Sequence, residues 1–219
     1  ALNSRPVVGA FTATATGAVR DDIKTLLRLV SPLVVTTGFD RPNLFFSVMQ
    51  PKNKSIELMK LIKERKQQFS VDELIIQSVD VTQRLEQNKQ FRLAQTVLLY
   101  YSMEDEVNTH GLVSALHHQG KRVLLPRVRD NQNLDVVPYT SDNLLPQGKY
   151  QIMEPTGEPF TDYNAIDLAI VPGLAFTKDG KRLGRGKGYY DRLLAQMPSV
   201  YKMGLCFPFQ IVKDIPTNR

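Results

Sequence analysis

The first 50 residues combine short apolar runs with one helical pattern. The run that starts at Val7 reads as a strand ending in small residues, and apolar positions every three or four residues predict a helix over 17–29. Runs rich in β-branched residues at 33–37 and 44–48 predict two further strands. This is a βαβ-like fragment, of a size at which an isolated hydrophobic core is marginal.

The next part of the chain has the spacing of helices. After a polar link at 51–54, the pattern predicts a basic helix over 56–66. A second helix is predicted to run to about Gln87. Its start is marked by Ser70 at the N-cap and Glu73 three residues later, the pattern of a capping box.

From residue 96 onward, runs typical of buried strands alternate with helical patterns. Strand, helix and strand at this spacing indicate a right-handed parallel βαβ unit, and therefore an α/β fold. Strands are predicted at 96–101, 122–126, 166–176 and 201–207, helices within 106–119 and over 188–197, and a hairpin-like stretch at 134–139.

Composition is that of a soluble globular protein, with 42% hydrophobic and 23% charged residues in 219. We expect a cytoplasmic protein with no membrane segment and no signal peptide. The single cysteine, Cys206, excludes an internal disulfide and reads as a buried strand residue. A net charge of +6 suits nucleic acid, phosphates or polyanionic small molecules equally, so it does not select among them.

One loop between a predicted strand and helix carries the clearest chemistry. Glycines at alternate positions of 184–188 let the backbone approach a ligand closely, and N–H groups at a helix start favour an anion. Arg182, Arg185 and Lys187 add positive charge, and Asp191 supplies a hard oxygen ligand. These features predict a phosphate site with Mg²⁺. A Walker loop is excluded because no Ser or Thr follows the Gly-Lys pair.

Several separated motifs resemble the 5-formyltetrahydrofolate cyclo-ligase family. Residues 171–176 and 182–191 look like its signature, and 101–107 resembles its folate-side motif. The shorter stretches that also fit are 125–127, 150–155 and 207–210. The resemblance runs from about Lys60 to Thr217.

This resemblance implies a three-layer α/β/α sandwich with a mostly parallel sheet over 55–219, and residues 1–54 precede that domain. It also implies conversion of 5-formyltetrahydrofolate to 5,10-methenyltetrahydrofolate, with ATP and Mg²⁺ as cofactors and release of ADP and phosphate. Phosphorylation of the formyl oxygen gives an iminium phosphate, which N10 attacks with loss of phosphate. Positioning and charge neutralisation would dominate such catalysis.

On the nucleotide side, the resemblance assigns ATP binding to one continuous run. The residues of this run are Arg182, Leu183, Gly184, Arg185, Gly186, Lys187, Gly188, Tyr189 and Tyr190. Arg185 and Lys187 would neutralise charge on the transferred phosphoryl group, and Tyr189 is the third predicted catalytic residue. Asp191 is the predicted Mg²⁺ ligand.

On the folate side, the resemblance implies that Tyr101, Glu106 and Tyr190 bind substrate. Glu106 would form a hydrogen bond to the pterin ring, and Tyr101 would line the folate pocket. The neighbouring Glu104 and Asp105 read instead as acidic residues at a helix N-terminus, stabilised by the helix dipole.

Two departures from the family pattern bear on activity. The family carries basic residues in its N-terminal helix where this chain has Ser55 and Met59. The family also continues beyond Thr217, so we expect the cyclo-ligase domain to be truncated at its C-terminus.

The N-terminal segment resembles a different family. Residues 11–16 and 38–44 are similar to RecQ-type DNA helicases, the first to their motif III. Neither the Walker lysine loop nor the acidic Mg²⁺ box is present, which excludes helicase activity on chemical grounds. The sequence thus predicts a fusion of two unrelated segments near residues 50–60.

The expected partner is the small-molecule substrate, with the protein a monomer and nucleic acid not a partner. Two alternatives stay open at this point. One is a catalytically inactive fusion product that retains nucleotide or folate binding, and the other is a DNA-binding helicase fragment.

Overall fold

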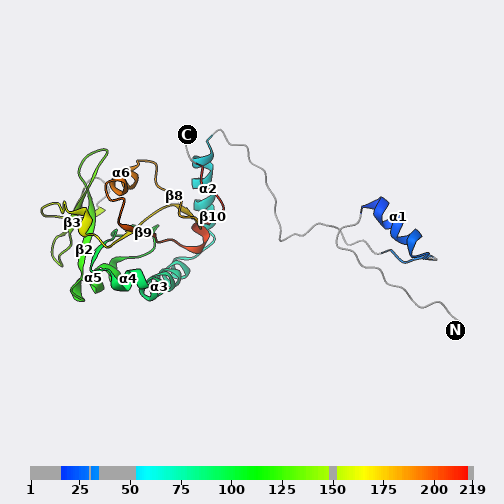
Figure 1. Ribbon diagram of the computed structural model, residues 1–219, viewed down its shortest axis with the longest axis horizontal. Coiled ribbons are helices and arrows are strands. Elements are labelled where there is room, and N and C mark those ends of the chain that lie inside the picture. Colours follow the sequence, from blue (N-terminus) through cyan, green and yellow to red (C-terminus); the bar gives the residue numbers. More distant parts are fainter. Residues whose placement is uncertain (1–15, 30, 35–52, 148–151, 217–219) are drawn as a thin grey trace. The chain divides into compact units, whose positions relative to one another are not determined.

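The structure, a computed structural model, describes residues 16–29, 31–34, 53–147 and 152–216. The chain divides into two units, Ala1–Met49 and Gln50–Arg219 (Figure 1). The second unit contains the candidate site.

The first unit contains helix α1, Gly17–Leu26. The hydroxyl of Thr16 accepts a hydrogen bond from the Val19 N–H and begins the helix. The predicted helix is confirmed, although it ends earlier than expected. The predicted strand at 33–37 is not formed at its first two residues, and the rest of it lies outside the described residues. So do the predicted strands that start at 7 and 44, and the βαβ-like fragment is therefore not shown.

A five-stranded sheet forms the centre of the second unit, in the order β3-β2-β1-β6-β9. Its strands are β1 (Thr96–Leu98), β2 (Arg122–Val128), β3 (Leu134–Pro138), β6 (Leu168–Val171) and β9 (Tyr201–Gly204). Every pair is parallel except β2 with β3, which forms a hairpin. Val97 of β1 pairs with Val123 on one side and Leu168 on the other. The predicted, mostly parallel sheet is confirmed.

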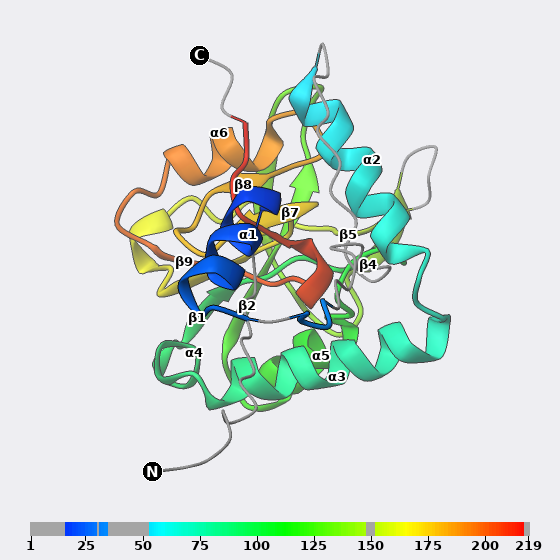
Figure 2. The same ribbon diagram turned by 90° about the vertical axis from the view of Figure 1, so that its right-hand side faces the viewer.

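Helices cover both faces of this sheet (Figures 1 and 2). Helices α3 (Val71–Gln87), α4 (Lys89–Leu93) and α5 (His110–His118) pack on one face, and α6 (Tyr189–Ala195) packs on the other. Helix α2 (Lys54–Lys66) does not belong to either layer and packs on a smaller sheet. The capping box predicted for α3 is present, with Ser70 and Glu73 bonded reciprocally. Helix α4 was not predicted; Asn88 caps it, and five residues are too few to show a periodic pattern.

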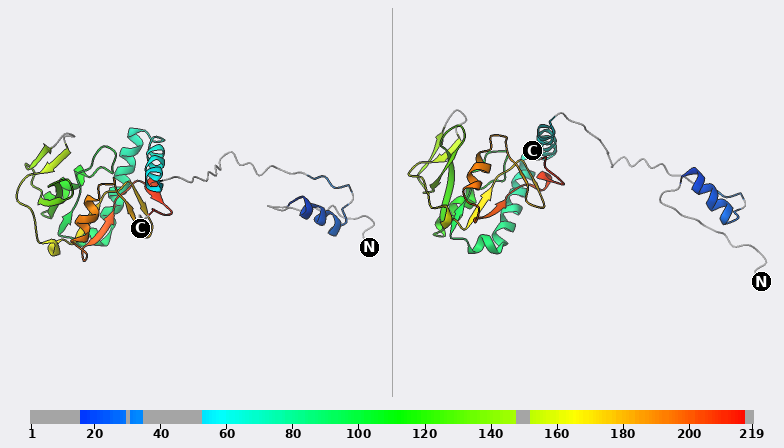
Figure 3. Two further views of the ribbon diagram at one scale, coloured as in Figure 1. Left: turned by 90° about the horizontal axis from the view of Figure 1, so that it is seen from above. Right: turned by 45° about the horizontal axis from the view of Figure 1, so that its top comes forward.

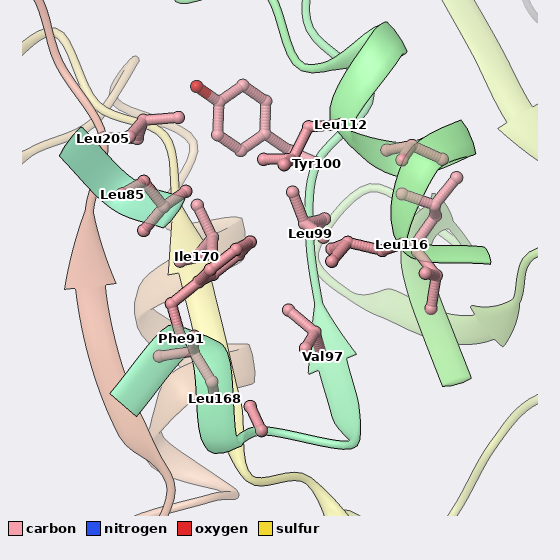
Figure 4. Close-up of a cluster of buried hydrophobic side chains, with 14 of the residues drawn as sticks. Leu85, Phe91, Val97, Leu99, Tyr100, Leu112, Leu116, Leu168, Ile170 and Leu205 are labelled. Atoms are coloured by element: carbon pink, nitrogen blue, oxygen red, sulfur yellow. The ribbon is translucent and has the colours of Figure 1, made fainter. Parts of the chain in front are cut away.

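Alternate residues of β1 divide the core into two clusters, as the pleat of a strand requires. Val97 and Leu99 pack in a cluster with Leu116 of α5 and residues of α3 and α4, and Figure 4 shows these side chains gathered between strand and helix. Leu98 points to the opposite face and packs with Leu193 of α6. The two clusters are the two interfaces of a three-layer α/β/α sandwich.

Two smaller sheets flank the central one. A three-stranded sheet contains β7 (Ala175–Thr177), β8 (Arg182–Leu183) and β10 (Ile211–Val212), and α2 packs on it through Ile62. Strands β4 (Leu144–Gln147) and β5 (Ile152–Pro155) form a hairpin that was not predicted. In Figure 3 this yellow-green hairpin lies at the end of the unit away from α2.

The predicted single strand over 166–176 is wrong. The chain leaves the central sheet after Val171 and enters the small sheet at Ala175, so this run forms β6 and β7. Pro172 lacks the N–H that would continue the ladder. At Gly173, a Cβ atom would lie 2.7 Å from the Phe176 ring, so any larger residue at this crossing would have to displace that ring.

None of the helices in the described ranges is long and apolar enough to cross a bilayer.

Candidate active site

The glycine-rich loop connects β8 to α6, as the sequence predicted. Gly186 has φ 91° and Gly188, the N-cap of α6, has φ 67°, a left-handed backbone that favours glycine. Within the described residues, no acceptor faces the backbone N–H groups from Gly184 to Tyr189. This stretch therefore offers several free donors to an anionic ligand.

Arg182, at the start of this loop, is held by groups of the protein itself. Its Nη1 donates to the Pro172 carbonyl at 3.2 Å, and its Nη2 forms an ion pair with Asp191. The guanidinium also lies 5.7 Å from the centre of the Tyr190 ring. Only 13% of the Arg182 side chain is exposed. Arg182 thus fixes the end of β6 and the first turn of α6 to β8.

Arg185 joins the loop to the predicted folate motif. Its Nη2 lies 2.5 Å from Asp105 Oδ1 and 3.3 Å from Glu106 Oε1, although these residues are about 80 positions earlier in the chain. The structure therefore brings together two motifs that the sequence could only propose separately.

Glu106 is mostly buried, with 13% of its side chain exposed. Its Oε2 accepts a hydrogen bond from the Met103 N–H at 3.1 Å. Burial raises the pKa of the Glu106 carboxyl, while the Met103 hydrogen bond and the charge of Arg185 oppose that rise. Glu106 is thus a mostly buried carboxylate that can accept further hydrogen bonds beyond those from Met103 and Arg185.

The acidic run at 104–106 does not begin a helix, contrary to prediction. Helix α5 starts only at His110, with Thr109 as its N-cap, so the helix dipole does not explain these carboxylates. They lie in a turn after β1, and Asp105 is the nearer partner of Arg185. Sequence reasoning missed Asp105. Three consecutive acidic residues in a protein with an arginine-rich loop were the available signal.

The two tyrosines predicted to bind substrate, Tyr101 and Tyr190, both pack against the first core cluster. Tyr190 packs against both core clusters, and burial together with the Glu106 charge raises the pKa of its hydroxyl. Tyr101 stacks on His110, with ring centres 3.8 Å apart, and packs against the same cluster as Tyr190. Tyr190 thus provides apolar surface near the Glu106 carboxyl, whereas the contacts of Tyr101 are with His110 and the core cluster.

Lys187 and Tyr189 lie on the side of the loop that faces the turn between β2 and β3. The Tyr189 hydroxyl donates to the Asp130 carbonyl at 3.1 Å, and Lys187 Nζ lies 5.8 Å from the Tyr189 ring centre. Arg192, which was not predicted, donates to the Lys187 carbonyl at 2.8 Å and to the Gln132 carbonyl at 2.6 Å. Arg192 therefore supports the loop from α6.

The described residues fit a nucleotide with Mg²⁺, but not a metal site made by protein alone. No group of three or more His, Cys, Asp or Glu residues is found in the described ranges. Mg²⁺ commonly takes one or two carboxylates and completes its shell with phosphate oxygens and water. Asp191 uses Oδ1 for Arg182, which leaves Oδ2 for a cation.

Met59, one of the two departures in the N-terminal helix, has a structural role here. It packs with Leu58 of α2 against the cluster that contains Leu183 of β8 and Ile215. The helix therefore supports the strand that leads into the glycine-rich loop.

The fold and this site define an α/β protein in which a glycine- and arginine-rich loop opens a helix beside a buried carboxylate. The sequence matches the 5-formyltetrahydrofolate cyclo-ligase family over residues 51–219, and the chain belongs to that family. It is 35% identical over 170 residues to the 5-formyltetrahydrofolate cyclo-ligase of Mus musculus, covering 72% of this chain and 84% of the mouse protein. The predicted family and ligase class are thus confirmed.

Solved structures agree with this assignment. The NMR structure of Aquifex aeolicus 5,10-methenyltetrahydrofolate synthetase superposes with a TM-score of 0.66 at 31% identity, covering 75% of this chain and 84% of that one. The predicted α/β fold class is confirmed by this likeness.

A second, short similarity concerns the helicase resemblance. A stretch of 49 residues, 22% of this chain, is 53% identical to the ATP-dependent helicase wrn-1 of Caenorhabditis elegans. It covers 5% of that helicase. This short match agrees with the resemblance to DNA helicases that the sequence predicted.

Proposed function

We propose that this chain converts 5-formyltetrahydrofolate to 5,10-methenyltetrahydrofolate, using ATP and Mg²⁺ and releasing ADP and phosphate. Family membership supports the reaction. The observation that carries the proposal is the contact of Arg185 with Asp105 and Glu106. It places the loop proposed for the nucleotide against the turn proposed for folate.

The chemical problem is the formyl oxygen, which is a poor leaving group. ATP supplies the phosphoryl group that turns this oxygen into a good one, so that N10 can close the ring with loss of phosphate. The chain's own residues are left to bind, orient and neutralise charge, because little covalent chemistry falls to the protein.

The nucleotide site proposed here is the run 182–190. Its free backbone N–H groups would receive phosphate oxygens, and the Nε and Nη1 donors of Arg185 have no partner among the described residues. Arg185 and Lys187 would neutralise charge on the transferred group, with Tyr189 beside them. Asp191 would hold Mg²⁺ through the oxygen that Arg182 does not use.

The folate site proposed here lies around Glu106. An ionised carboxylate can accept hydrogen bonds from the N–H groups of a pterin ring, and Tyr101 and Tyr190 would pack against that ring. We also propose that residues 55–219 form the cyclo-ligase domain and that 1–54 is a separate helicase-like fragment.

The direct test is turnover of 5-formyltetrahydrofolate with ATP and Mg²⁺, followed by the absorbance of the methenyl product. We expect product formation that depends on both ATP and Mg²⁺. A pure, folded preparation with no turnover and no folate binding would contradict the proposal. Thermal stabilisation by ATP or folate without turnover would instead identify an inactive binding protein.

The metal assignment predicts the effect of Asp191→Asn. Loss of the carboxylate should lower Mg²⁺-dependent turnover by roughly 100-fold or more, the scale of other electrostatic contributions to catalysis. Thermal unfolding should still show a cooperative transition. Asp179→Asn, an exposed change in the turn before β8, is the control and should keep full turnover. Unchanged activity in Asp191→Asn would remove the metal assignment.

A further inference from the structure

Two carboxylates compete for a single nitrogen of Arg185. Asp105 lies nearer to Nη2, at 2.5 Å, and Glu106 lies at 3.3 Å. Within the described residues, Asp105 has no other hydrogen-bond partner, whereas Glu106 also accepts from Met103. The Asp105 side chain is 40% exposed and that of Glu106 only 13%. Arg185 therefore pairs mainly with the more exposed carboxylate.

This division has a geometric consequence. A guanidinium is planar, so a partner that fixes Nη2 also fixes the directions of Nη1 and Nε. While Asp105 holds Nη2, Arg185 approaches Glu106 through that one nitrogen, at 3.3 Å from Oε1. Without Asp105, Arg185 could turn and form a two-pronged pair with Glu106, the preferred geometry of arginine with a carboxylate.

We propose that Asp105 is a positioning residue that draws Arg185 away from Glu106, so that Glu106 stays available to a hydrogen-bond donor of the folate substrate. This inference rests on the proposed function. It assigns to Asp105 a part in substrate affinity through Arg185, without contact to the substrate.

The charges around Glu106 give the proposal an independent readout. The groups that face its carboxyl are Arg185 of the loop, Asp105 of its own turn, Tyr100 after β1 and Tyr190 of α6. Both tyrosine hydroxyls have raised pKa values and stay neutral. Replacing Asp105 by a neutral residue removes a negative neighbour and strengthens the pair with Arg185. Both changes lower the pKa of Glu106.

The test compares Asp105→Asn with two matched variants of the full chain. Asp105→Glu keeps the charge, and Glu104→Gln removes the adjacent exposed charge, which has no partner among the described residues. For Asp105→Asn we expect the KM for 5-formyltetrahydrofolate to rise roughly fivefold, the factor that corresponds to about 1 kcal/mol. We also expect the acidic limb of the kcat/KM profile to move to lower pH. Glu104→Gln should match the wild-type chain, and Asp105→Glu should restore most of the affinity.

A carboxyl titration of the ligand-free protein separates this inference from the proposed function. The ¹³C resonance of Glu106, identified by its loss in Glu106→Gln, should titrate at lower pH in Asp105→Asn than in the wild-type chain. If Asp105→Asn does not fold, Asp105→Ser makes the same charge change. Suppose that the wild-type chain turns over substrate, and that Asp105→Asn shows the wild-type KM and the wild-type titration of Glu106. This result would overturn the role of Asp105 and leave the proposed function intact. If the wild-type chain shows no turnover, the proposed function is overturned. If, in addition, Glu106 titrates at the same pH in Asp105→Asn as in the wild-type chain, the effect of Asp105 on the Glu106 carboxyl is overturned as well.

Discussion

At the scale of single residues, Arg182 and Arg185 differ in how far the protein already uses their charge. Arg182 is nearly buried and engaged by Pro172, Asp191 and Tyr190. Arg185 is 43% exposed and, among the residues that the structure describes, it forms hydrogen bonds through Nη2 alone. The sequence predicted that both bind ATP and that Arg185 is also catalytic, but it could not show their partners, because spacing reports charge and not contacts. The structure assigns Arg182 to support of the loop and leaves Arg185 with free donors.

This difference predicts that one conservative change lowers the stability of the fold and that another lowers the rate of catalysis. Arg182→Lys removes the planar fork that reaches Pro172 and Asp191 together, and should lower the free energy of unfolding by about 1–3 kcal/mol. Arg185→Lys should leave the thermal transition almost unchanged but reduce kcat, because lysine lacks the planar guanidinium that can hold Asp105 through Nη2 while Nε and Nη1 point to a phosphate. Denaturant unfolding and steady-state kinetics of the two variants decide this. Equal loss of stability in both would contradict the assignment.

Glu106→Gln is a second prediction for a single residue: the change should not lower the stability of the fold, but it should lower the affinity for folate. Burial raises the pKa of the folded-state carboxyl, so the stabilisation from protonation is present at low pH and is lost as the pH rises through that pKa. Glu106→Gln should therefore be at least as stable as the wild-type chain at neutral pH. Folate affinity should fall roughly 10- to 100-fold, since a charge-assisted hydrogen bond is lost. Unfolding curves and folate titrations at several pH values check both signs.

At the scale of elements, hydrophobic spacing predicted α1, α2, α3, α5, α6 and most strands of the central sheet. The pattern missed α4, β8 and β10, which are too short to show a period, and it missed the β4–β5 hairpin. Strand β4 contains Pro146, and a proline lowers the expectation of a strand, so the β4–β5 hairpin was missed. The continuous apolar run at 166–176 could not show that the chain changes sheets at Pro172. The glycine loop was predicted from its residues, but its contact with the turn at 103–106 depends on tertiary structure.

The loop that joins β8 to α6 predicts the outcome of a glycine substitution. Gly188→Ala places a Cβ at φ 67°, with Arg192 Nη1 only 2.7 Å away. A left-handed non-glycine residue costs about 1–2 kcal/mol, and displacing Arg192 would disturb the loop as well. We expect lower stability and weaker ATP binding, measured by thermal unfolding and nucleotide titration.

Gly111→Ala is the matched control for this change. Gly111 lies in α5, and a Cβ atom there would meet nothing within 4 Å. Alanine is favoured over glycine inside a helix by about 0.5–1 kcal/mol, so this variant should gain stability and keep ATP binding. Similar losses in both variants would show that the loop has no special backbone requirement.

At the scale of the whole molecule, the second unit has the fold and the sequence of the 5-formyltetrahydrofolate cyclo-ligase family, whose match begins at residue 51 and leaves the first unit outside it. The contact of Arg185 with the acidic turn joins the two ends of the candidate site within the second unit. Neither composition nor net charge could have located it, because the positive charge equally suited nucleic acid. The loop follows β8 of the small sheet and the acidic turn follows β1 of the central sheet, so their contact depends on how the two sheets pack and not on the order of strands within one sheet.

The most direct measurement of this account follows both products of one reaction. The purified chain is mixed with ATP, Mg²⁺ and 5-formyltetrahydrofolate, and the methenyl product and ADP are quantified in the same samples. The account predicts equal amounts of the two at every time point and neither product when ATP or folate is omitted. Methenyl product without ADP, or ADP release that does not depend on folate, would contradict it.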